Sequence, residues 1–144
     1  MNLTRWPISV VNAVLLVGCA GFALFQTWGF MFAMGEAETA VGLGVAALLI
    51  VTLLGTAGLV IGALGSWSRW PIYSMIPLVS GLCVLPTAVL FLWQEGRASW
   101  QNMQTGAYYS GPFVWASILL PVPLDLAALL LSGLRFRHLK RSTP

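Results

Sequence analysis

Charged residues are scarce in this chain: they make up 8% of its 144 residues, against roughly 25% in soluble globular domains. Apolar residues make up 58%. A chain of this composition would not dissolve as a monomer, which excludes a soluble domain. The formal net charge of +3 does not indicate nucleic-acid binding, because the cations stand at the ends of apolar segments and not on a folded basic face.

Histidine and cysteine are also scarce, and this restricts the chemistry. The single histidine, His138, stands in a basic tail, so no histidine is placed to ligate a haem inside an apolar segment, although methionine ligation is chemically possible. No nucleophile, base and orienting group converge in the sequence. Cys19 and Cys83 fall near the centres of apolar segments, where reduced thiols act as small apolar groups. We therefore expect no cofactor and no metal, and a non-enzymatic protein is favoured.

Long apolar stretches are what the chain has in abundance. Four of them, separated by short polar connectors, are near or above the roughly 20 residues that span a bilayer. We expect an all-α integral membrane protein, a single domain over residues 1–144 in which four transmembrane helices form a bundle, at about 8–29, 41–67, 72–93 and 111–134.

Two further segments are assigned outside the bilayer. Residues 94–110 are expected to form an outside loop, for which two interpretations stand: a short helix in the membrane interface, or a lid or partner-docking loop. Residues 135–144 are expected to form a basic cytoplasmic tail.

The distribution of positive charge predicts the orientation. Short loops rich in Lys and Arg stay in the cytoplasm. The side shared by the amino terminus, the second connector and the carboxy tail holds Arg5, Arg69, Arg135, Arg137, Lys140 and Arg141, whereas the other side holds Arg97. Both termini are therefore predicted to be cytoplasmic, in a multi-pass protein of a bacterial-type inner membrane.

Asp125 is the ionisable residue that stands inside these stretches. A charge near the middle of a membrane helix costs roughly 2.5–3.5 kcal/mol, so the side chain is expected to face the bundle interior or a wet cavity. Pro121 and Pro123 each remove an intrahelical hydrogen bond just before it. An interrupted helix beside a carboxylate is also how many transporters form a midplane ion site. The alternative interpretation is a kinked helix whose acid only bonds to a neighbour.

Depth along the helices suggests partners for this acid. Counting from the cytoplasmic ends at 1.5 Å per residue places Ser80, Thr56 and Cys19 near the level of Asp125. We expect a hydrogen bond from Ser80 or Thr56, and we expect burial to favour the neutral acid.

Four glycines in the second stretch, Gly55, Gly58, Gly62 and Gly65, recur at spacings of three, four and three and lie on one side of the helix. Small residues at such spacing let another helix approach closely, which drives association in lipid. They predict a helix-packing seam, either within the bundle or with another subunit.

These observations support a small non-enzymatic integral membrane protein, an accessory or assembly subunit of a membrane complex or a homo-oligomer. The expected partners are the lipid bilayer and other membrane subunits or a second copy. The alternative is a small transporter or channel that uses Asp125 as a proton or cation site. A third interpretation is a membrane enzyme that acts on lipid or quinone through Glu95, Tyr108 and Tyr109 of the outside loop.

Overall fold

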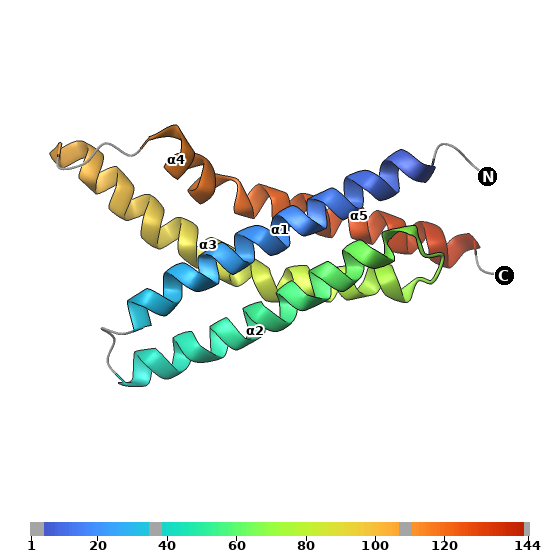
Figure 1. Ribbon diagram of the computed structural model, residues 1–144, viewed down its shortest axis with the longest axis horizontal. Helices are drawn as coiled ribbons and strands as arrows, with labels where there is room; N and C mark the ends of the chain where they lie inside the picture. The colour runs from blue at the N-terminus through green and yellow to red at the C-terminus, as the bar shows by residue number, and fades with distance from the viewer. Residues whose placement is uncertain (1–4, 35–38, 107–110, 143–144) are drawn as a thin grey trace.

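The computed structural model describes residues 5–34, 39–106 and 111–142. The described chain is helical, with elements α1 (Arg5–Met34), α2 (Thr39–Leu64), a 3-10 turn η1 (Gly65–Trp67), α3 (Ile72–Thr105), α4 (Pro112–Leu119) and α5 (Pro121–Ser142). The helices run alternately up and down the bundle, so that the start of α1 and the end of α5 lie at the same end (Figure 1). We call this the termini end and the opposite one the distal end.

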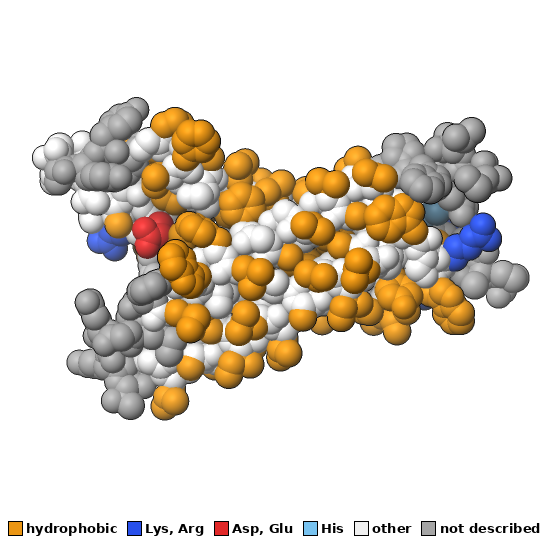
Figure 2. Space-filling model, in the orientation of Figure 1, with side chains coloured by type: hydrophobic (Ala, Val, Ile, Leu, Met, Phe, Trp, Pro, Cys, Tyr) orange, Lys and Arg blue, Asp and Glu red, His pale blue; other side chains and the backbone are white. Residues whose placement is uncertain are grey.

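Four segments are long and apolar enough to cross a membrane: Ile8–Met31, Gly42–Trp67, Ile72–Thr105 and Pro112–Arg141. On the face shown in Figure 2, hydrophobic side chains cover the length of the bundle and charged side chains lie at its two ends. This distribution is the one expected of a bundle surrounded by lipid. The chain is therefore a multi-pass membrane protein whose exposed apolar surface contacts the bilayer.

The third helix is longer than the sequence analysis expects. It was predicted to end at residue 93, but α3 continues to Thr105, so residues 94–105 of the expected loop are helical. Hydropathy falls after Trp93, yet Gln, Glu, Arg, Ala and Met favour a helix whether or not lipid surrounds it. The helix ends at Gly106, whose left-handed conformation (φ 68°) is a common helix end. At 1.5 Å per residue, α3 is about 50 Å long and extends beyond a hydrocarbon core of about 30 Å.

The fourth span consists of two helices. α4 ends at Leu119, the chain bends at Leu120, and α5 begins at Pro121. Proline fits the first position of a helix because it has no N–H to donate, so Pro121 starts a new helix more readily than it continues the old one. α5 then runs to Ser142, which makes most of the expected basic tail helical.

The interior has two apolar clusters. The first, cluster A, is near the middle of the bundle and contains Leu16, Cys19, Ala20, Ala23, Leu59, Ala63, Val84 and Ala128. The second, cluster B, lies toward the distal end and contains Phe30, Leu49, Phe91 and Ile118. Buried polar residues lie between these clusters and at the termini end.

Candidate intramembrane polar site

The inward face of α1 carries a repeating polar pattern. Asn12, Cys19 and Gln26 are spaced by seven residues, and each is no more than 1% exposed. Seven residues are nearly two helical turns, so the three side chains lie on one side of the helix, about 10.5 Å apart. The sequence analysis considered Cys19 but missed Gln26. The signal available was this spacing, together with an amide inside an apolar stretch.

Asp125 lies one turn into α5, directly after the break at Leu120. Its side chain is 3% exposed, so it faces the protein interior and not lipid. The thiol of Cys19 on α1 lies next to the Asp125 carboxyl, where it can act as a weak donor. The acid therefore joins α5 to α1 in the middle of the bundle.

The hydroxyls that were expected to serve Asp125 lie elsewhere. The Thr56 hydroxyl donates to the Thr52 carbonyl oxygen at 2.8 Å, so its one proton is used inside α2. Ser80 is buried against Gly58, in the contact between α2 and α3. The depth estimate placed Cys19 at the level of Asp125, although the hydrogen bond was expected from Ser80 or Thr56.

The side chains around Asp125 are largely apolar. Cys19 and Ala128 belong to cluster A, and Leu124 packs against it. Pro121, one turn before the acid, is also fully buried. Pro121 and Pro123 have no N–H, which leaves the carbonyl oxygens four residues earlier, on Ser117 and Leu119, without that intrahelical donor.

Two threonines and Gln26 lie between clusters A and B. The Thr52 hydroxyl donates to the Leu48 carbonyl oxygen at 2.8 Å. It also hydrogen-bonds to the Thr87 hydroxyl, and Thr87 must be the donor because the Thr52 proton is already used. In contrast, neither end of the Gln26 amide has a hydrogen-bond partner among the described residues. An unpaired amide at membrane depth is costly, so Gln26 is the least satisfied polar group in this region.

The glycine seam lies against α3. A Cβ added to Gly55 would stand 2.9 Å from the Ser80 carbonyl oxygen, and one added to Gly62 would stand 2.8 Å from Pro77 Cβ. Added Cβ atoms on Gly58 and Gly65 would overlap Ser80 and Tyr73. All four glycines therefore serve packing within the bundle, and this face of α2 is not free for another subunit.

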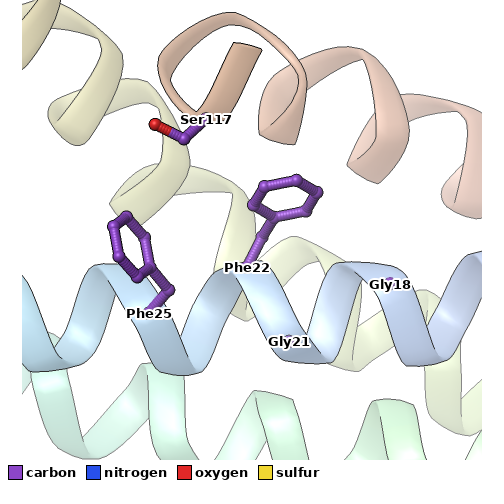
Figure 3. Close-up of a pocket in the computed structure, with 5 residues that line it drawn as sticks. All are labelled: Gly18, Gly21, Phe22, Phe25 and Ser117. Atoms are coloured by element: carbon purple, nitrogen blue, oxygen red, sulfur yellow. The ribbon is translucent and has the colours of Figure 1, made fainter. Parts of the chain in front are cut away.

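An apolar groove lies on the side of the bundle between α1 and α4. Gly18, Gly21, Phe22, Phe25 and Ser117 line it, with a volume of about 350 Å³. The rings of Phe22 and Phe25 rise from α1 toward Ser117 of α4 (Figure 3). A Cβ added to Gly18 or Gly21 would meet no atom within 4 Å, so the floor of the groove is open. The groove opens sideways, toward the lipid, and Asp125 does not line it.

Of the residues that the enzyme interpretation needs, the structure describes only Glu95. Glu95 is exposed on α3, while Tyr108 and Tyr109, which the enzyme interpretation needs, lie outside the described residues. Within residues 5–34, 39–106 and 111–142, no group of three His, Cys, Asp or Glu side chains is arranged to hold a metal ion.

Comparison with protein-family models, with curated proteins and with solved structures finds no match for the chain.

Proposed function

We propose that this chain is a small non-enzymatic protein of a bacterial-type inner membrane that packs laterally against another membrane subunit or a second copy. The observation that carries the proposal is the groove between α1 and α4. It combines an open glycine floor with two phenylalanine rings, well inside an apolar span. Lipid offers no hydrophobic contrast, so close van der Waals packing of this kind is what holds membrane helices together.

The orientation belongs to the same proposal. Both termini are placed in the cytoplasm because six of the seven Lys and Arg residues belong to the termini end. Reporter fusions at each terminus test this. Cytoplasmic activity at both ends is expected, and an external reporter at either end contradicts the orientation.

Site-directed photo-crosslinking in intact membranes tests the lateral contact. A photoactivatable phenylalanine analogue replaces Phe25, which lines the groove, and as a control replaces Leu54, which is 70% exposed near the middle of α2. We expect a protein product of defined mass from Phe25 and lipid adducts from Leu54. A product of twice the chain mass identifies a homo-oligomer. Lipid adducts alone at both positions contradict the proposal.

A second candidate function is proton or cation transport through Asp125. The observation that favours it is a buried carboxyl one turn after a double-proline break, the arrangement expected of a midplane ion site. Reconstitution in vesicles with a pH-sensitive dye tests it. Transport predicts proton flux that Asp125→Asn abolishes. Accessory packing predicts no flux above that of empty vesicles and normal assembly of the Asn variant.

A further inference from the structure

Arg135 holds the termini end of the bundle together. Its Nη2 atom donates hydrogen bonds to the carbonyl oxygens of Gly65 and Ser68, at 3.1 and 2.8 Å. These bonds tie α5 to the connection between α2 and α3. Arginine suits this role because its guanidinium group presents several donors in a fixed plane.

No acidic side chain among the residues that the structure describes lies near this guanidinium group. The four acids of the chain are Glu36, Glu38, Glu95 and Asp125. Of the glutamates, the structure describes Glu95, which lies in the distal part of α3. Asp125 is ten residues before Arg135 on the same helix, or about 15 Å. A half-buried charge is costly unless a counter-charge is supplied, and no side chain among the described residues supplies one for Arg135.

Polar atoms without a hydrogen-bond partner lie on both α3 and α5 toward the termini end of the bundle. The second terminal nitrogen of Arg135, Nη1, has no hydrogen-bond partner among the described residues, and neither do the hydroxyls of Ser132 and Ser74. Both serines are at most 1% exposed. Ser132 precedes Arg135 by three residues and shares its face of α5. Ser74 follows Tyr73, which packs against Gly65, one of the two residues that Arg135 binds.

The level of this cluster in the membrane is indicated by tryptophan. Trp67 and Trp70 flank Ser68 and are 51% and 72% exposed. Tryptophan rings prefer the headgroup level of a bilayer, so Arg135 stands where lipid phosphates lie. A phosphate oxygen accepts hydrogen bonds from a guanidinium group and from hydroxyls, and its charge neutralises the arginine.

We propose that Arg135, Ser132 and Ser74 form a binding site for the phosphate group of an anionic phospholipid. The site differs from a general attraction of the basic tail for the membrane, because it requires a particular guanidinium group and two particular hydroxyls. It also does not depend on a protein partner, so it stands or falls separately from the groove between α1 and α4.

Lipid binding to the full chain in mild detergent tests this site. Native mass spectrometry measures the affinity for phosphatidylglycerol, phosphatidylcholine and inorganic phosphate. Arg135→Gln should weaken phosphatidylglycerol binding at least about tenfold, as expected for loss of a hydrogen bond to a charged group. The matched control is Arg137→Gln, which removes an exposed charge two residues later. It should cost about fivefold or less, the effect of one cation near an anionic surface.

A second pair of variants guards against misfolding of the Arg135 variant. Ser132→Ala and Ser74→Ala leave the bonds to Gly65 and Ser68 in place, and each should weaken phosphatidylglycerol binding by about fivefold. Equal losses in the Arg135 and Arg137 variants, or no preference for phosphatidylglycerol over phosphatidylcholine, would overturn the proposal in favour of diffuse attraction. Inorganic phosphate that competes fully at matched concentration would overturn the lipid as the source of the phosphate.

Discussion

The two sides of this bundle are packed in opposite ways. Between α2 and α3, the glycine seam brings the backbones so close that an added Cβ on Gly55 or Gly62 would stand less than 3 Å from α3. Between α1 and α4, two glycines have open space above them and the helices leave a groove. Glycine thus allows two helices to pack in close contact on one side of the bundle, whereas on the other side the glycines line an open groove.

The difference shows what a glycine stripe means in a membrane protein. Lipid tails are as apolar as leucine, so helices associate where their surfaces fit and not merely where they are hydrophobic. A seam already filled by a neighbouring helix fixes the fold of the single chain. A groove that no helix of the bundle fills is available to a partner, and the groove between α1 and α4 has this property.

The largest expected effect comes from filling the closed seam. Gly55→Val would place a branched side chain against the carbonyl oxygen of Ser80, which would stand 2.9 Å from the added Cβ. Because this backbone atom must move, we expect a loss of about 3 kcal/mol or more, at the upper end for overpacked cores. Thermal unfolding in detergent, followed by tryptophan fluorescence, measures it. Gly21→Val is the matched control in open space and should change the midpoint little. Similar losses for both variants would show that the two contacts do not differ.

A smaller effect of opposite sign is expected at Gln26, which lies on the inward face of α1. Gln26→Leu removes a buried amide that has no partner in the described structure, so the isolated chain should gain about 1–2 kcal/mol in unfolding free energy. Gln101→Leu, at an exposed position of α3, serves as the control and should be nearly neutral. A destabilised Gln26 variant would mean that the amide is paired in the membrane.

The hydrogen bond between Thr52 and Thr87 should contribute less. A double-mutant cycle with Thr52→Val, Thr87→Val and the double variant isolates the interaction between these two hydroxyls. Hydrogen bonds between membrane helices average about 0.6 kcal/mol, because the separated helices also find partners. We expect a coupling energy of this size. A value near zero would indicate that the α2–α3 contact rests on glycine packing alone.

Sequence reasoning predicted the four spans from hydropathy, and it predicted that the glycines of α2 form a packing face. It left open which helix would fill that face, because the spacing of small residues describes one surface and not its complement. Pro77 of α3 packs against Gly62, and the spacing of the glycines in α2 does not reveal this partner. The end of α3 was missed because the polarity change at Trp93 ends the apolar stretch but not the helix.

For the polar site, the burial of Asp125 was predictable from the sequence, but its hydrogen-bond partner was not. Burial of Asp125 followed from the cost of a charge in lipid, whereas its partner depended on which donors were already used. The Thr56 hydroxyl donates its proton to the backbone carbonyl oxygen of Thr52, which its position in the sequence does not reveal. The side chain that lies next to the acid is instead Cys19. The same limit of sequence reasoning applies to Gln26. A spacing of seven residues indicates that the side chain faces inward, but it does not show whether a hydrogen-bond partner lies nearby.

The smallest change in stability is expected when the groove between α1 and α4 is filled. This substitution is the most direct test of the difference between the two sides of the bundle. Gly21→Leu adds a side chain where no atom lies within 4 Å, so the unfolding free energy of the isolated chain should stay within about 0.5 kcal/mol of the parent. If the groove holds a partner, the same substitution should remove the cross-link formed at Phe25, because the added leucine occupies the partner's space. An unchanged cross-link would place the contact elsewhere on the bundle. A large loss of stability would instead show that α4 already closes on α1 in the membrane, and the contrast between the two sides would disappear.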